Sequence, residues 1–157
     1  MRSVRAKEPL DGSYFRRVTK LYLDIDGVLL TAKHTRPAPG VEEFVAFVTQ
    51  YFECYWLTTH CKGDPATALR YLSTYLPASS LAQLGAVQPT NWDALKTEAI
   101  DLRADFYWLE DRPFQAEIAC LEAAGAADRL LVVDLNTPEA LRQVQGTLRQ
   151  AVRSQRL

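Results

Sequence analysis

The sequence predicts an α/β fold: a central parallel sheet of about five strands with helices on both faces. Short apolar runs alternate along the chain with longer segments in which apolar residues recur at helical spacing. The short runs are apolar throughout, which is typical of strands buried on both faces of a parallel sheet. Distinctive polar residues stand directly after these runs, at the sheet edge where ligands bind in such folds.

Length and charge restrict the class of protein. The 157 residues are enough for one domain with a sizeable core, so we expect a single domain over residues 1–157. Residues 1–17 are polar and mixed in charge, which predicts a loose N-terminal arm. The net charge is −1, from 18 basic and 19 acidic side chains. This balance predicts neither strong general nucleic-acid binding nor attraction to anionic membranes.

Cysteine usage and hydropathy indicate the compartment. Cys54, Cys61 and Cys120 lack metal-ligand spacing, and we expect them to be reduced thiols. The N-terminus has no apolar segment of signal-peptide length, and no run approaches the length of a membrane span. We therefore expect a cytoplasmic protein without a membrane partner.

The first third of the chain predicts two strands joined by a loop and a helix. Residues 18–25 are apolar and β-prone and predict the first strand. Residues 31–40 combine proline, glycine and charged side chains, which is typical of a loop. Apolar residues then recur at helical spacing over 41–51, and the apolar, aromatic run 52–57 predicts the second strand.

The middle of the chain begins with a clear helix start. Asp64 precedes Pro65, and aspartate suits the N-cap while proline suits the first helical position. We expect this helix to end before Pro77. A short strand over 84–87 and a helix over 92–102 should follow.

The last third predicts two strand–helix pairs. Residues 105–109 predict a strand that ends at an acidic pair, and Pro113 opens a helix that ends near Gly125. The continuous apolar run 130–135 predicts another strand, and Thr137 starts the last helix. The residues expected to face inward are Phe114, Ile118 and Leu121 in the first helix and Leu141, Val144, Leu148 and Val152 in the second.

Two carboxylates stand just beyond the first predicted strand. Asp24 and Asp26 follow the apolar run 21–23, and Gly27 then lets the backbone turn away. Residues two apart in an extended chain point to the same side, so both carboxylates should face one small volume. They repel each other unless a cation or a shared proton intervenes. This predicts a metal-assisted site in which one carboxylate acts as the nucleophile and the other donates and accepts protons.

Residues 24–29, Asp-Ile-Asp-Gly-Val-Leu, resemble the first motif of the haloacid dehalogenase (HAD) superfamily, an apolar strand followed by Asp-x-Asp-Gly. Calcium-binding loops also contain this string. A calcium loop needs further oxygen ligands at alternating positions after the glycine, and Val28, Leu29 and Leu30 supply none.

Three further HAD motifs are matched in the expected order over residues 21–135. The strand ending at Thr58 is similar to the second motif, in which a hydroxyl donates to a phosphate oxygen, and Thr59 is a rival for this role. Lys96 stands where the lysine of the third motif is expected. Residues 106–111, an apolar strand with an acidic pair, resemble the fourth motif but have glutamate first instead of the commoner Asp-Asp.

The resemblance implies a Mg²⁺-dependent phosphatase on a three-layer Rossmann-like sandwich, because phosphatases of the superfamily keep an aspartate two residues after the nucleophile. In the implied mechanism Asp24 attacks phosphorus and Asp26 acts as general acid and base. Thr58 and Lys96 would clamp the transferring group. The implied Mg²⁺ ligands are Asp24, the backbone carbonyl of Asp26, and Glu110 or Asp111, with Asp111 slightly favoured.

Many HAD proteins carry an inserted cap domain, but segments 30–52 and 60–92 are too short for one here. We therefore expect a capless protein with an open site and substrate contacts from nearby loops. The candidates for these contacts are Lys33, His34, Arg36, Thr59, His60, Lys62, Asn91, Trp92 and Arg112. A proton-shuttling role is the alternative for His34 and His60, because histidine titrates near neutral pH.

The substrate class stays open at this point. The expected partner is a phosphorylated molecule, and open sites of the superfamily act on phosphoproteins, on nucleic-acid ends as in RNA repair, or on small molecules when an oligomer closes the mouth. A non-catalytic binding or regulatory module is the competing class. Loss of Asp24 or Asp26 would favour that class, and both are present.

Overall fold

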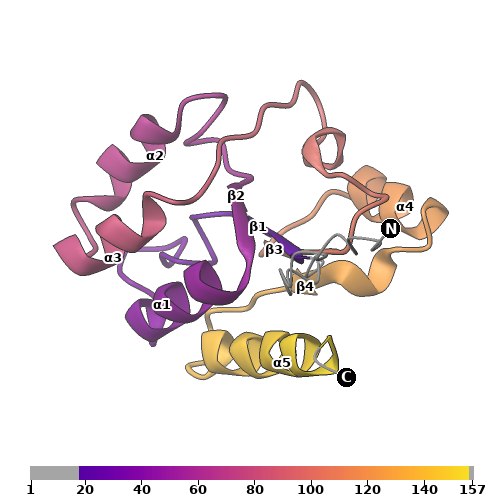
Figure 1. The fold of residues 1–157 in the computed structure, drawn as a ribbon. Helices are drawn as coiled ribbons and strands as arrows, with labels where there is room; N and C mark the ends of the chain where they lie inside the picture. The colour runs from indigo at the N-terminus through magenta and orange to yellow at the C-terminus, as the bar shows by residue number, and fades with distance from the viewer. Residues whose placement is uncertain (1–17, 156–157) are drawn as a thin grey trace, which may run out of the picture.

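A computed structural model describes residues 18–155, so the expected arm over 1–17 lies outside the described residues. The described chain forms a four-stranded sheet in the order β2–β1–β3–β4 with every pair parallel (Figure 1). The strands are β1 (Lys20–Leu23), β2 (Glu53–Trp56), β3 (Phe106–Glu110) and β4 (Leu130–Val132). The predicted α/β fold with a parallel sheet is confirmed.

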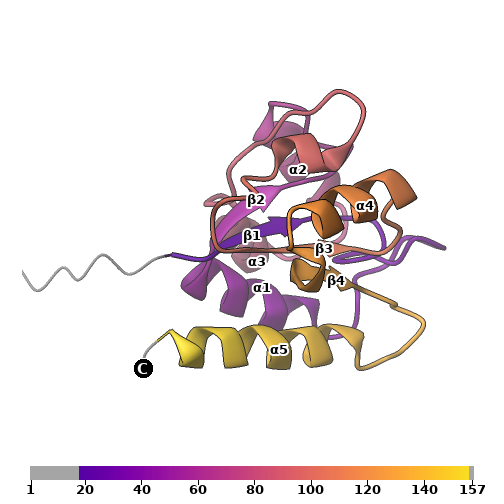
Figure 2. The same ribbon diagram turned by 90° about the vertical axis from the view of Figure 1, so that its right-hand side faces the viewer.

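Helices cover both faces of the sheet. The helices α1 (Val41–Tyr51) and α5 (Ala140–Ser154) lie side by side on one face, and α4 (Gln115–Ala123) lies on the other (Figures 1 and 2). Side chains alternate accordingly along β1: Leu21 and Leu23 join the core with α1 and α5, whereas Tyr22 packs in a second core with Leu121 of α4. The sheet is therefore the middle of three layers.

Two helix predictions are confirmed in detail. The helix α1 spans the predicted residues 41–51 and begins after Gly40 in a left-handed conformation. The helix α2 (Pro65–Leu72) begins as predicted, since the Ala66 amide donates to Asp64 Oδ1 at 3.0 Å. It ends at Leu72, before the expected limit at Pro77.

The expected strand over 84–87 is wrong, and the sheet of residues 18–155 has four strands instead of about five. In its place α3 (Ala78–Leu84) runs up to this segment, and a turn joins Leu84 to Val87. Pro77 supplies the N-cap position of α3, so the proline that ends one helix also precedes the next. Just after the predicted strand, Gln88 forms an isolated parallel bridge to Tyr55 of β2.

The expected helix over 92–102 is also wrong, because only one 3₁₀ turn, η1 (Lys96–Ala99), forms there. The Glu98 carboxylate accepts the amides of Asp93, Ala94 and Leu95 at 3.0–3.1 Å. These bonds satisfy the amides in a loop conformation, so the chain needs no regular helix here.

In the C-terminal third the predicted strands and helices occur in the predicted order, but their boundaries differ from the prediction. A short 3₁₀ turn, η2 (Ala127–Arg129), precedes β4. The helix α4 begins at Gln115 instead of Pro113, and Phe114, expected to face inward, is 62% exposed. This correction has a local cause: Phe114 holds the N-cap position, where its amide donates to Glu117 Oε1 at 2.8 Å. Val132 on the edge strand β4 is 58% exposed.

The last helix buries part of the predicted face. Leu141 and Leu148 are buried, and Val144 and Val152 are partly buried against the same core.

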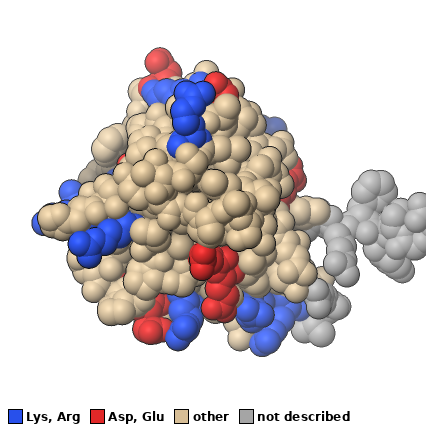
Figure 3. Space-filling model, turned by 90° about the vertical axis from the view of Figure 1, so that its left-hand side faces the viewer, with Lys and Arg blue, Asp and Glu red and all other residues tan. Residues whose placement is uncertain are grey.

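In residues 18–155 no helix is long and apolar enough to cross a membrane. On the face shown in Figure 3, acidic and basic side chains are interspersed among uncharged ones.

Candidate active site

The predicted motif residues gather at the carboxyl ends of three adjacent strands. Asp24 follows β1, Thr58 follows β2, and Glu110 ends β3. The chain passes from β1 to β2 on one side and then crosses to β3 on the other, so connections diverge at this edge. Such switch points leave a crevice in which ligands bind.

The loop after β1 is a compact turn around one carbonyl group. The Ile25 carbonyl accepts the amides of Val28, Leu29 and Leu30 at 2.9–3.1 Å. This turn ends β1 earlier than the predicted limit at residue 25. The Ile25 amide in turn donates to Asp24 Oδ1 at 2.7 Å, which orients that carboxylate.

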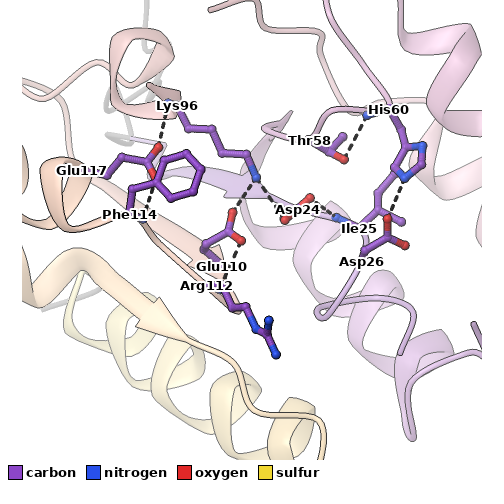
Figure 4. Close-up of polar contacts among 10 residues, drawn as sticks. All are labelled: Asp24, Ile25, Asp26, Thr58, His60, Lys96, Glu110, Arg112, Phe114 and Glu117. Carbon is purple, nitrogen blue, oxygen red and sulfur yellow. Dashed lines mark hydrogen bonds and ion pairs between the residues drawn. The ribbon is translucent and has the colours of Figure 1, made fainter. Parts of the chain in front are cut away.

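Lys96 joins two carboxylates that are far apart in the sequence (Figure 4). Its Nζ lies 3.1 Å from Asp24 Oδ2 and 2.6 Å from Glu110 Oε2, and the three side chains are only 6–15% exposed. Burial acts to lower the pKa of Lys96, but the charges of Asp24 and Glu110 outweigh burial and raise this pKa above its ordinary value. Lys96 is therefore an ammonium ion at neutral pH.

A buried glutamate fixes the backbone that carries this lysine. Glu117 is 2% exposed, and its Oε2 accepts the Lys96 amide at 2.7 Å while its Oε1 accepts the Phe114 amide. One carboxylate thereby joins η1 to the start of α4 (Figure 4). Lys96 is thereby held next to the carboxyl ends of β1 and β3, although the expected helix does not form.

Asp24, Glu110 and Asp111 form a cluster in which one carboxylate oxygen from each lies within 4.8 Å of the others. When all three carboxylates are ionised, they exceed the single ammonium of Lys96 by two negative charges. Burial first, and then repulsion from Asp24, raises the pKa of Glu110 to about 8, while Lys96 opposes this rise.

The donor set fits Mg²⁺, which binds carboxylate oxygens and would neutralise the excess charge. Glu110 already pairs with Lys96 and accepts the Arg112 amide at 3.3 Å. Asp111 lies directly over Gly27, because a Cβ built on Gly27 would overlap the Asp111 carboxyl group. This close approach brings Asp111 to the loop that carries Asp24 and favours Asp111 as the ligand.

The Asp26 side chain lies in a different environment from that of Asp24. His60 Nε2 lies 2.7 Å from its Oδ2, and the Tyr71 hydroxyl donates to its Oδ1 at 3.0 Å. The side chain is 44% exposed and is not part of the three-carboxylate cluster. Burial and the Asp26 charge raise the pKa of Tyr71 to about 12, so the phenol keeps its proton at neutral pH.

The two threonines after β2 differ in exposure. Thr58 is fully buried, and its Oγ1 accepts the His60 amide at 3.3 Å, whereas Thr59 is exposed. Figure 4 shows Thr58 between the Asp24 and His60 side chains. The structure therefore favours Thr58 over Thr59 as the hydroxyl next to Asp24.

The remaining substrate-binding candidates separate into two groups. Lys62 Nζ lies 4.9 Å from the Trp92 ring centroid, and Lys96 Nζ lies 6.0 Å from the same centroid, so these residues share one rim of the site. The others, Lys33, His34, Arg36 and Asn91, are exposed in loops, and no described contact within 18–155 joins them to the carboxylate cluster. The exposed side chain of Arg112 points away from Asp24 in Figure 4.

Tyr71 and Glu117 are site residues that sequence reasoning missed. Glu117 had a recognisable signal, since a glutamate three residues after a helix N-cap commonly accepts the cap amide. Tyr71 had none, because it lies within α2 among residues of ordinary helical spacing.

A scan against protein-family models finds no match for this chain, and a search of curated proteins finds no significant relative. The resemblance to the HAD superfamily therefore rests on the four motifs and on the site they form.

Replacement of Gly27 by alanine should destabilise the protein and displace Asp111. Gly27 has φ +81°, a region costly for alanine, and the added Cβ meets the Asp111 carboxyl group. Gly40→Ala is the matched control, since Gly40 has φ +77° but open space around its Cβ. We expect a loss of about 1 kcal/mol in free energy of unfolding for Gly40→Ala and about 2–4 kcal/mol for Gly27→Ala, measured by urea unfolding. Equal losses would contradict the close packing of Asp111 on Gly27.

Proposed function

We propose that this protein is a Mg²⁺-dependent phosphomonoester hydrolase that works through an aspartyl-phosphate on Asp24. The observation that supports the proposal most strongly is that the two carboxylates of the loop after β1 lie in different environments. Asp24 is buried and paired with Lys96, whereas Asp26 is partly exposed, accepts the Tyr71 hydroxyl and contacts the His60 ring. Different environments for two neighbouring carboxylates support a nucleophile and a proton-transfer group.

The first step uses both aspartates. An Asp24 oxygen attacks phosphorus, a new O–P bond forms, and the bond from phosphorus to the leaving oxygen breaks. Asp26, in its protonated form, gives its proton to that leaving oxygen. Lys96 holds Asp24 in place and offsets the charge gathered by the phosphoryl oxygens, and the Thr58 hydroxyl donates to one of them.

The second step regenerates the enzyme. The Asp26 carboxylate takes a proton from a water molecule whose oxygen attacks phosphorus, and the bond between phosphorus and Asp24 breaks. Inorganic phosphate leaves, Asp24 is again a carboxylate, and Asp26 is again protonated. Both proton transfers thus use one side chain in two protonation states.

The residues that would hold Mg²⁺ are Asp24 and Asp111, with Glu110 beside them as the partner of Lys96 and the backbone carbonyl of Asp26 as a further candidate. When bound, the ion neutralises negative charge on the phosphoryl oxygens. The chain itself orients the ligands: the Ile25 amide fixes Asp24, and Gly27 admits Asp111.

The exposure of Asp26 supports an open site that accepts a bulky phosphorylated substrate. Lys62 and Trp92 form a rim next to Lys96 that is suited to a group adjoining the phosphate. Phosphoproteins and nucleic-acid ends are the alternative macromolecular substrates to a small phosphate ester. A non-catalytic binding module is a weaker alternative, because it needs neither the Lys96 contact to Asp24 nor donors on Asp26.

The proposal predicts that Mg²⁺ stabilises the protein and that a phosphomonoester panel shows hydrolysis only in its presence. At a Mg²⁺ concentration about 100 times the Kd, the melting temperature should rise by roughly 5–10 °C. Asp111→Asn should remove most of this rise, and Asp128→Asn, which removes the same charge from an 80% exposed side chain, should preserve it. Hydrolysis that persists in excess chelator, or an equal rise in both variants, would contradict the assignment.

A further inference from the structure

Asp26 is held by two side chains of the segment that follows β2. His60 lies three residues after Leu57, and Tyr71 lies in α2, yet they bond to different oxygens of the same carboxylate. The distances are 2.7 Å from His60 Nε2 to Oδ2 and 3.0 Å from the Tyr71 hydroxyl to Oδ1. The Asp26 carboxylate is thus oriented by two separate contacts.

Packing fixes the two donors relative to each other. The rings of His60 and Tyr71 stack with centroids 3.9 Å apart and an interplanar angle of 10°. Tyr75 meets Tyr71 edge to face, with centroids 5.7 Å apart. The backbone of His60 is held as well, since its amide donates to the buried Thr58 hydroxyl. Neither ring can turn without losing contact with its neighbour.

A proton-transfer group needs this kind of support. Asp26 lies on a loop and is 44% exposed, so without partners its side chain would occupy several rotamers. Proton transfer requires hydrogen-bond distance to the leaving oxygen, and a displacement of about 1 Å can cost a hundredfold in rate. Each carboxyl oxygen has two lone-pair positions, so contact with His60 on one oxygen and with Tyr71 on the other still leaves Asp26 a position that faces the substrate or water.

We propose that His60 and Tyr71 are positioning residues that hold Asp26 in the orientation for proton transfer. The inference rests on the proposed function, in which Asp26 serves the leaving oxygen and the attacking water. It assigns His60, expected from the sequence to contact substrate, to Asp26 instead. It also makes the segment after β2 a support for the acid–base group, in addition to its role of carrying Thr58.

Three variants distinguish the hydrogen bonds that His60 and Tyr71 make from the packing of their rings. His60→Phe keeps a flat ring for stacking but removes the donor, and His60→Gln keeps a donor near the position of Nε2. Tyr71→Phe keeps the ring and removes the hydroxyl. Tyr51→Phe is the control, because it removes the same hydroxyl from an exposed residue of α1. Kinetics with an aryl phosphate and an alkyl phosphate are measured for each variant in Mg²⁺.

His60→Phe should lower kcat for the alkyl phosphate by roughly 10- to 100-fold, and Tyr71→Phe by a smaller factor, with KM nearly unchanged. The aryl phosphate should lose less, because its leaving group needs less protonation. His60→Gln should restore most of the loss, and Tyr51→Phe should match the parent protein. In an Asp26→Asn background the His60 and Tyr71 changes should add little further loss.

Several results would overturn the inference. Equal losses for both phosphates, a rise in KM at constant kcat, or full additivity with Asp26→Asn would each show that the pair does not act through Asp26. If His60→Phe does not fold, His60→Gln and Tyr71→Phe carry the test, with thermal melting as the check. Activity that survives Asp24→Asn would refute the proposed function itself, whereas normal kinetics in His60→Phe and Tyr71→Phe with an inactive Asp24→Asn would refute only this inference.

Discussion

Asp24→Asn should abolish hydrolysis of a generic aryl phosphate, with a loss of at least about 10⁴-fold in kcat. An amide oxygen is a poor nucleophile, and asparagine carries no charge to pair with Lys96 or with Mg²⁺. The measurement is the rate of phosphate release in Mg²⁺ for the variant and the parent protein. Undiminished activity would show that another residue attacks phosphorus.

The Asp24→Asn variant should remain folded, so its loss of activity is interpretable. Asparagine has the shape of aspartate, and its oxygen can accept the Ile25 amide as Asp24 Oδ1 does. Its neutral side chain also removes repulsion from the buried Glu110, while Lys96 keeps Glu110 as a partner. Without Mg²⁺ we expect a melting temperature equal to that of the parent protein or higher. A large drop would make the loss of activity a folding effect.

Asp26→Asn should lower activity by roughly two to four orders of magnitude, the usual cost of losing a general acid–base group. The asparagine still fills the space beside His60 and Tyr71, but it cannot give a proton to the leaving oxygen or take one from water. The loss should be larger for alkyl than for aryl phosphates, because an alkoxide is a poorer leaving group.

The test of Asp26 is the dependence of kcat/KM on the leaving-group pKa across a series of phosphate esters. The slope should be steeper in Asp26→Asn than in the parent protein, since unassisted departure depends more strongly on the leaving group. Asp128→Asn, on an exposed side chain, serves as the charge-matched control and should keep the parent slope. Parallel slopes would leave Asp26 a structural residue of the loop.

Features set by neighbouring residues were predictable from the sequence. The period of the apolar residues over 41–51 predicted α1 with its observed bounds, and the pair Asp64–Pro65 predicted the start of α2. The run 105–109 predicted β3 to within one residue at each end, since the strand spans Phe106–Glu110. These elements follow from local propensity and from apolar periodicity, both of which are visible in a short stretch of sequence.

The two wrong element predictions have different causes. In one segment specific hydrogen bonds replace the expected helix, and in the other the apolar run fits more than one secondary structure. The helix expected over 92–102 is reduced to η1 because one side chain, Glu98, captures three backbone amides. The apolar residues 84–87 suited a strand as well as a helix end, and short apolar runs do not distinguish the two. In both segments the pattern was present and a competing local structure prevailed.

For the site, the sequence by itself determined which residue types follow each strand: Asp24, Asp26 and Gly27 after β1, Thr58 after β2, and an acidic pair at β3. The tertiary structure decided which partners these side chains contact. Lys96 reaches Asp24 across 72 positions of the chain, and Tyr71 reaches Asp26 across 45. It also turned the two aspartates of one loop toward different partners. Such contacts depend on how whole elements pack, and the periodicity of a single element carries no information about the neighbour it will meet.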